Sequence, residues 1–154
     1  MAVLVIGLGS DGAGDDGIGI AVVEALRREA CDGIRTELVS DPSELVRLLA
    51  TSDPVIIVDA VVGVDSPVGT VDVHEDGALS SLPQSSVSTH GIGVGQAIEL
   101  ARVVHSNAFS PRIALVGIHI DPPKAYGFEP SAPVAAALTV AKLRVLSLCK
   151  RFHA

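Results

Sequence analysis

The chain has 154 residues, of which 48% are hydrophobic, and its formal net charge is −7. This length fits one ordinary domain over residues 1–154 with a buried core. The acidic balance argues against nucleic acid and anionic membranes as partners, because both need a basic surface. Only 3% of the residues are aromatic and tryptophan is absent, so Val, Ile, Leu and Ala are expected to build the core.

Strand-like and helix-like segments alternate along the chain. Apolar or alternating runs predict strands over residues 2–8, 34–39, 55–58, 69–74 and 112–118, the fourth at an edge. Helical spacing predicts helices over residues 17–30, 42–49, 91–105 and 133–150, the second capped by Asp41 with Pro42 in its first turn. This order predicts an α/β fold with three α/β/α layers and a twisted, mainly parallel sheet of about five strands.

A loop rich in glycine and aspartate joins the first strand to the first helix. It runs from Gly7 to Gly19 and contains Asp11, Asp15 and Asp16. Glycines in such a turn let the backbone bend sharply and approach a ligand. The carboxylates disfavour a phosphate and favour a cation, either a metal or a positively charged partner. A second explanation stays open, because carboxylates in a first turn also stabilise the helix end itself.

The same loop satisfies the dinucleotide pattern GxGxxG over Gly7 to Gly12, after a strand and before a helix. However, Asp15 and Asp16 occupy the place where a pyrophosphate would rest. No acidic residue ends the second strand, since Glu37 lies in its middle. Nucleotide binding is therefore the weaker interpretation of this loop.

Two further polar residues follow strand-like or loop segments at informative places. Asp59 ends the apolar run of residues 55–58, at the mouth of the predicted sheet, and His90 lies between a serine-rich loop and the third helix. The carboxyl ends of parallel strands meet at one rim, where ligands bind. We therefore expect Asp16, Asp59 and His90 to converge in one cleft at that rim. His119 follows a strand and is a secondary candidate for the same rim.

The remaining histidines and the two cysteines predict no site. His74 and His105 are expected to face solvent, and His153 to lie in a frayed tail. Cys31 and Cys149 lack CxxC spacing, and a structural zinc site is excluded. One disulfide between them is possible, but two partly buried free thiols in a reducing compartment are the simpler interpretation. No charged segment precedes the first apolar run and no apolar stretch reaches about 18 residues, so we expect a cytoplasmic protein without a membrane span.

Three motifs follow one another along the chain: GLGS and GDDGIG within residues 7–19, IIVDA at residues 56–60, and STHG at residues 88–91. Together they resemble the [NiFe]-hydrogenase maturation proteases, and the resemblance covers nearly the whole chain. Ser10 stands where this family commonly has Asn, and Asp16 where many of its members have Glu.

The resemblance implies an endopeptidase that removes the C-terminal extension of the hydrogenase large-subunit precursor. It implies a folded precursor already loaded with nickel, which the positions matching Asp16, Asp59 and His90 contact. These three residues are therefore the candidate catalytic and metal-ligating residues of a nickel-dependent endopeptidase of the aspartic or metallo type. Two carboxylates and an imidazole suit a borderline divalent ion and leave positions open for the substrate.

The same resemblance implies a mechanism without a protein nucleophile, because the metal polarises the scissile carbonyl or a water molecule. The nickel arrives with the substrate, so the isolated enzyme is expected to bind it weakly or not at all. One alternative is a non-catalytic or differently targeted relative that uses the same acidic rim to bind a metal or a precursor.

Overall fold

The computed structural model describes residues 2–9, 14–62, 66–81, 93–121 and 129–154 of the chain. The strands are β1 (Val3–Leu8), β2 (Ile34–Val39), β3 (Val55–Val62), β4 (Val71–Glu75) and β5 (Ile113–Ile120). The α-helices are α1 (Ile18–Arg28), α2 (Leu45–Leu48), α3 (Val94–Val104) and α4 (Ala132–His153), and the short 3-10 helices are η1 (Gly14–Gly17), η2 (Pro42–Glu44) and η3 (Asp76–Ser81). His90 and residues 10–13 lie outside the described residues.

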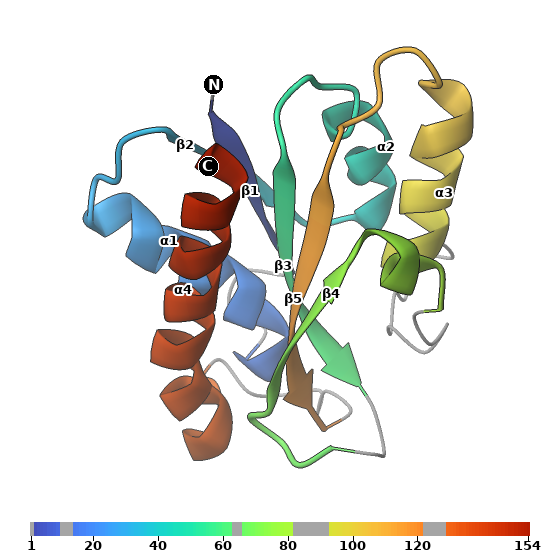
Figure 1. Cartoon of the computed structure of the whole chain (residues 1–154). Helices are drawn as coiled ribbons and strands as arrows, with labels where there is room; N and C mark the ends of the chain where they lie inside the picture. Colours follow the sequence, from blue (N-terminus) through green and yellow to red (C-terminus); the bar gives the residue numbers. More distant parts are fainter. Residues whose placement is uncertain (1, 10–13, 63–65, 82–92, 122–128) are drawn as a thin grey trace.

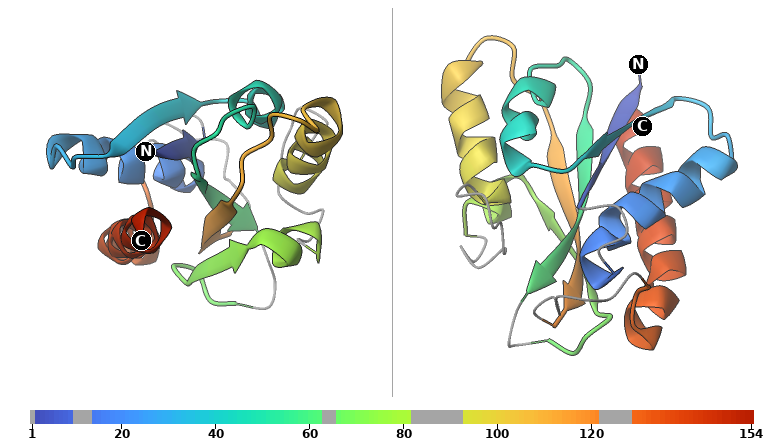
Figure 2. Two further views of the ribbon diagram at one scale, coloured as in Figure 1. Left: turned by 45° about the horizontal axis from the view of Figure 1, so that its top comes forward. Right: turned by 180° about the vertical axis from the view of Figure 1, so that it is seen from behind.

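The five strands form one sheet in the order β2-β1-β3-β5-β4. All neighbours are parallel except β4, which pairs antiparallel to β5 at one edge. Helices α1 and α4 cover one face, and α2 and α3 cover the other (Figures 1 and 2). The predicted α/β fold with a mainly parallel sheet and an edge strand is confirmed.

The core follows from the alternation of side chains along each strand. In β3, Ile56 and Val58 pack with α1 and α4, whereas Val55 and Ile57 pack with α2 and α3. Strands buried on both faces are continuously apolar, as the sequence shows. By the same alternation, Asp59 lies on the α2–α3 face of the sheet.

Several predicted ends differ from those observed. The expectation that the strand ends before Asp59 is wrong, because β3 continues to Val62 and pairs with β5 from Asp59↔Gly117 to Val62↔Ile120. A carboxylate therefore lies inside a strand. The first turn of the second helix is as predicted: Asp41 accepts a hydrogen bond from the Ser43 N–H at 2.9 Å, although the α-helical part is only four residues long.

Helix α4 is longer than predicted and contains a buried cysteine. It continues to His153, which is thus part of its last turn and not of a frayed tail. Cys149 is buried in α4, Cys31 is half-buried, and both are free thiols, as expected. Burial, with a smaller contribution from Cys31, raises the pKa of Cys149 to about 11, so this thiol stays protonated at neutral pH.

Within the described part of the chain, α4 is the one helix whose length and apolar composition would suffice to cross a membrane. Core helices of water-soluble proteins pass the same test. Val134, Ala141 and Val145 of α4 are fully buried against the sheet and α1. The length and composition of α4 are therefore weak evidence for a membrane span. The expected absence of a membrane partner stays a prediction.

Candidate active site

Glycines allow the end of β1 and the start of α1 to pack in direct backbone contact. A Cβ atom on Gly19 would collide with the carbonyl oxygens of Leu8 and Val58. Gly9 has φ +152°, and a Cβ atom there would collide with the carbonyl oxygen of Asp16. Only glycine fits such positions. The glycines of the loop thus hold the turn that carries Asp16 against the ends of β1 and β3.

Asp16 and Asp59 lie where the sheet changes its direction of winding. The β1–β3 ladder ends at Gly7↔Val58, so Asp59 is the first residue of β3 beyond that ladder. The 3-10 helix η1, which carries Asp16, contacts β3. Ligands of open α/β sheets bind at this kind of switch point, outside the carboxyl ends of the strands.

Asp59 is a buried carboxylate with 9% of its surface exposed, and not the exposed group that its expected place at the mouth of the sheet implied. Its Oδ1 accepts a hydrogen bond from the Ala60 N–H at 2.8 Å. None of the ion pairs among the described residues involves Asp59 or Asp16. A buried carboxylate without a cation nearby is costly to ionise.

The surroundings raise the pKa of both carboxyl groups. Burial raises the pKa of Asp59 well above its ordinary value, the Ala60 N–H opposes this, and repulsion from Asp16 adds to it. Burial also raises the pKa of Asp16. The two groups are thus close enough for their charges to interact, and we call them the Asp16–Asp59 pair.

A proton or a cation bound near both carboxylates would relieve the repulsion between them. A shared proton would make the two groups an acid–base pair, and a divalent cation would use the same oxygens as ligands. Among the described residues, no group of three or more His, Cys, Asp and Glu side chains could hold a metal ion. His90, the third candidate, lies outside the described residues, so its convergence with the pair stays a prediction.

The sequence indicated that His119 follows a strand, but it lies inside β5. Its imidazole forms a pair with the Asp72 carboxylate of β4. Its Nε2 lies 2.5 Å from Asp72 Oδ2, and its buried Nδ1 has no hydrogen-bond partner in the described residues. Gly117 is the register partner of both Asp59 and Asp72, so these side chains share the α2–α3 face with His119. Sequence reasoning missed Asp72, because only the antiparallel pairing of the edge strand reveals its neighbour.

The other histidines stand apart from the carboxylate pair. His74 on β4 and His105 after α3 are half-buried, whereas we expected both to face solvent. The strand β4 lies at the sheet edge but is covered in part, which accounts for His74.

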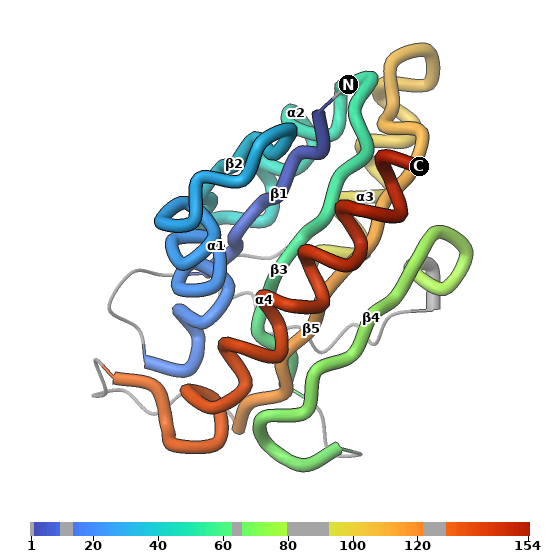
Figure 3. The backbone as a smooth tube through the Cα atoms, turned by 60° about the vertical axis from the view of Figure 1, so that its left-hand side comes forward, coloured from blue at the N-terminus to red at the C-terminus, as the bar shows by residue number. Residues whose placement is uncertain are grey.

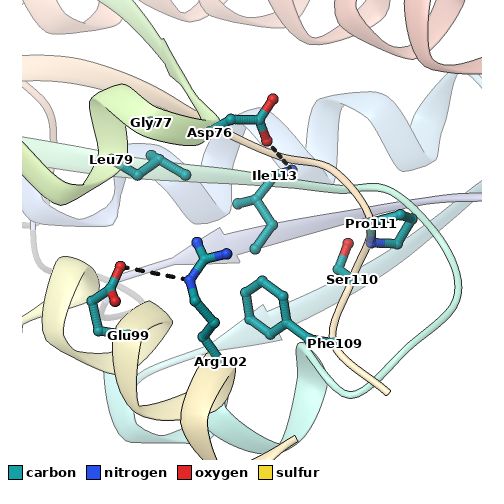
Figure 4. A pocket seen from close by; sticks show the side chains of 9 residues that line it. All are labelled: Asp76, Gly77, Leu79, Glu99, Arg102, Phe109, Ser110, Pro111 and Ile113. Atoms are coloured by element: carbon teal, nitrogen blue, oxygen red, sulfur yellow. Dashed lines mark hydrogen bonds and ion pairs between the residues drawn. The ribbon is translucent and has the colours of Figure 1, made fainter. Parts of the chain in front are cut away.

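A cavity of about 310 Å³ lies at the opposite end of the sheet, where β5 begins (Figure 4). The Arg102 guanidinium lies over the Phe109 ring, 4.7 Å from its centroid, and its Nε is 3.8 Å from Glu99 Oε1. Asp76 Oδ1 accepts a hydrogen bond from the Ile113 N–H at 3.4 Å. The charged groups of this cavity are thus already engaged with protein partners.

A profile of the hydrogenase maturation protease family matches residues 20–148 of the chain. The chain belongs to the hydrogenase maturation protease family. The hydrogenase 2 maturation protease of Escherichia coli (strain K12) is 28% identical over 121 residues, 77% of this chain and 73% of that protein. Protein FrxA of Pyrococcus furiosus is 31% identical over 138 residues, 89% of this chain and 97% of that protein.

The hydrogenase maturating endopeptidase HybD from E. coli has the same fold, with a TM-score of 0.83 and 25% identity over 98% of this chain and 93% of that chain. The resemblance that the sequence motifs indicated is thereby confirmed, as is the fold. Membership in the hydrogenase maturation protease family supports a role as a processing endopeptidase, hence a hydrolase.

Proposed function

We propose that the protein removes the C-terminal extension of a nickel-loaded [NiFe]-hydrogenase large-subunit precursor, with Asp16, Asp59 and His90 contacting the nickel of that substrate. The observation that carries the proposal is the Asp16–Asp59 pair, two carboxylates whose charges interact, with raised pKa values and no ion-pair partner among the described residues. Perturbed groups of this kind gather at functional sites.

The charge of the pair supports a cationic substrate group. Ionising both carboxylates is unfavourable while the site is empty of positive charge, and a divalent ion on the substrate removes that penalty. The Ala60 N–H donates to Asp59 Oδ1 and so orients the carboxylate, while Oδ2 accepts no hydrogen bond from the residues that the structure describes. Bound nickel supplies Lewis-acid activation of a carbonyl or a water molecule. The carboxylates would then orient that water or carbonyl. One of them would take a proton from the attacking water and pass it to the amine nitrogen that leaves as the C–N bond breaks.

Specificity for the loaded precursor follows from the same groups. Two carboxylates and an imidazole, without thiolates or a fourth protein ligand, make a weak site for free nickel. The enzyme therefore recognises the metal only together with the folded precursor, in the cytoplasm where the precursor is assembled. Cleavage then reports that nickel insertion is complete.

The test compares one precursor in nickel-loaded and nickel-free forms. Mass spectrometry of the large subunit is expected to show loss of the C-terminal extension for the loaded form only, with casein left intact. Nickel added to the enzyme alone is expected to give no cleavage of the nickel-free form. Cleavage of the nickel-free precursor contradicts nickel recognition. Binding of the loaded precursor without any shortening contradicts the protease assignment and identifies a non-catalytic relative.

A further inference from the structure

The carboxylate of Asp15 bridges two parts of the chain that are 116 residues apart. Its Oδ1 accepts a hydrogen bond from the Ser131 N–H at 2.6 Å, and its Oδ2 accepts one from the Ser131 hydroxyl at 3.0 Å. Ser131 is the N-cap residue of α4, and its own side chain makes no capping hydrogen bond to that helix. Figure 3 shows the start of α4 beside the segment that leads into α1.

This bridge differs from ordinary helix capping. Carboxylates near the first turn of a helix ordinarily stabilise that same helix, and this was one explanation for Asp15 and Asp16. Here Asp15 stands just before α1 but caps α4. Its charge meets the positive end of α4, and both of its oxygens are engaged in charge-assisted hydrogen bonds.

The α4 end of the bridge is rigidly placed. Val134 and Ala137, in the first turns of α4, are buried in the core. Gly69 packs against the same end, because a Cβ atom there would lie 2.7 Å from the Pro133 carbonyl oxygen. A helix held in this way is a fixed anchor for the η1 turn.

Asp15 and Asp16 are neighbours in η1, so the contact of Asp15 with α4 also restricts the position of Asp16. Successive side chains of a 3-10 helix point about 120° apart, because it has three residues per turn. When Asp15 points to α4, Asp16 points elsewhere, and its charge reaches Asp59 of β3. The backbone of Gly9 packs directly against the backbone of Asp16, because a Cβ atom on Gly9 would collide with the Asp16 carbonyl oxygen. The side chain of Asp16 has no hydrogen bond or ion pair among the described residues, so its placement depends on its neighbours.

We infer that Asp15 is a positioning residue for the processing reaction: through Ser131 it ties the η1 turn to α4 and holds Asp16 toward Asp59. The expected effect on kcat rests on the proposed function. The bridge itself is a property of the fold, and it can be tested by a measurement that does not depend on activity.

The experiment compares Asp15→Ala, Asp15→Asn and Ser131→Ala in the full chain. Asp15→Ala removes both acceptors, and kcat for the loaded precursor is expected to fall about 10- to 100-fold with KM within about twofold, because support of a reacting group is lost. Asp15→Asn is expected to recover most of kcat, since the amide oxygen accepts from the Ser131 N–H and the hydroxyl can accept from the amide nitrogen. Ser131→Ala, which keeps the N–H donor, is expected to cost about threefold.

Hydrogen exchange of the backbone amides of residues 14–18 gives the second readout. Asp15→Ala is expected to accelerate this exchange, and Asp15→Asn to leave it near the wild-type rate. Ser110→Ala is the matched control, because it removes a buried hydroxyl that donates to the Asp53 and Arg112 carbonyl oxygens at the other end of the sheet. It is expected to lower thermal stability without changing kcat or the exchange of residues 14–18.

Two results overturn the inference. One is an Asp15→Ala variant with wild-type exchange over residues 14–18, and the other is wild-type kcat per folded molecule despite faster exchange. If Asp15→Ala does not fold, Ser131→Ala decides instead, and wild-type kcat with wild-type exchange over residues 14–18 in that variant contradicts the bridge. A wild-type protein that leaves the loaded precursor uncut refutes the proposed function, whereas the exchange data still decide whether Asp15 holds the turn.

Discussion

Charged side chains have ion-pair partners at one end of the sheet, whereas two carboxylates at the other end have none among the described residues. Where β5 begins, Glu75 lies 3.7 Å from Arg112 and 2.9 Å from Arg151, and the Arg112 guanidinium lies over the Phe152 ring. Where β3 passes the end of β1, the Asp16–Asp59 pair has raised pKa values and no ion pair among the described residues. Within the part of the chain that the structure describes, the charges at the first end are balanced by partners, and the two carboxylates at the second end are not.

The contrast supports the proposal that the chemistry takes place at the end of the sheet that holds the Asp16–Asp59 pair. Paired charges cost little and need no further partner, so the balanced end requires nothing from outside. The unbalanced end carries a cost that a ligand or substrate of positive charge relieves. Local features that conflict with stability are expected at functional sites.

The largest expected effect is on catalysis at the unbalanced end. Asp16→Asn and Asp59→Asn are each expected to lower the rate of precursor shortening by about 10²–10⁴-fold, since each removes an acid–base or ligand group. Glu99→Gln, at the balanced end, is expected to change the rate less than twofold. Single-turnover kinetics on the loaded precursor measure both. A full rate for Asp59→Asn would place the chemistry elsewhere in the molecule.

Two glycines sharpen the comparison through stability. Gly19→Ala forces a methyl group into the backbone of β1 and β3, and the free energy of unfolding is expected to fall by about 3 kcal/mol or more. Gly77→Ala, at the balanced end, adds a Cβ atom with nothing within 4 Å and is expected to change stability by less than about 0.5 kcal/mol. Urea titrations measure both values, and equal losses would contradict the close packing at Gly19.

The pH dependence of stability separates the two ends next. In the unfolded chain Asp59 ionises near 3.8, whereas its folded pKa is raised well above that value. Its contribution to stability is thus fully present below about pH 4 and is lost as the pH rises through the folded pKa. Asp59→Asn is expected to stabilise the protein at neutral pH, by about 1.4 kcal/mol for each unit between the two pKa values. The gain is expected to vanish near pH 4 in urea titrations run across this range, and a gain independent of pH would refute the raised pKa.

The smallest effect is expected from the paired charges. Glu75→Gln breaks two partly exposed ion pairs, and such pairs contribute about 0–1 kcal/mol. The loss of stability is expected to be below about 1 kcal/mol and to shrink in high salt, with processing unchanged. Thermal unfolding at two salt concentrations tests this, and a loss of processing activity would remove the functional distinction between the ends.

Local signals in the sequence were sufficient for most of the fold. Apolar runs located the strands, and Asp41 with Pro42 located the start of a helix. The end of β3 was misplaced because a charged Asp59 in an apolar run suggests the end of a strand. Only the register with β5, which continues to Ile120, shows that the strand goes on.

The sequence singled out candidate site residues but not the contacts that support them. Asp16 and Asp59 stand out because carboxylates follow apolar runs at one rim. The partner of Asp15 was not predictable, since Ser131 is 116 residues away and ordinary in its local sequence. The pair of Asp72 and His119 likewise depends on which strand the edge strand adopts as its neighbour. Long-range pairing leaves no trace in a single sequence.

The strand order has a consequence for how the protein is made. β5 is the last strand to be synthesised, yet it lies between β3 and β4 in the finished sheet. β4 pairs only with β5, so it waits without a neighbour until residues 113–120 have left the ribosome. Non-local pairing of this kind folds slowly. Ser131 is synthesised later still. Asp16 is therefore present in the nascent chain long before the contact between Asp15 and Ser131 can form, and an incomplete chain has no assembled site.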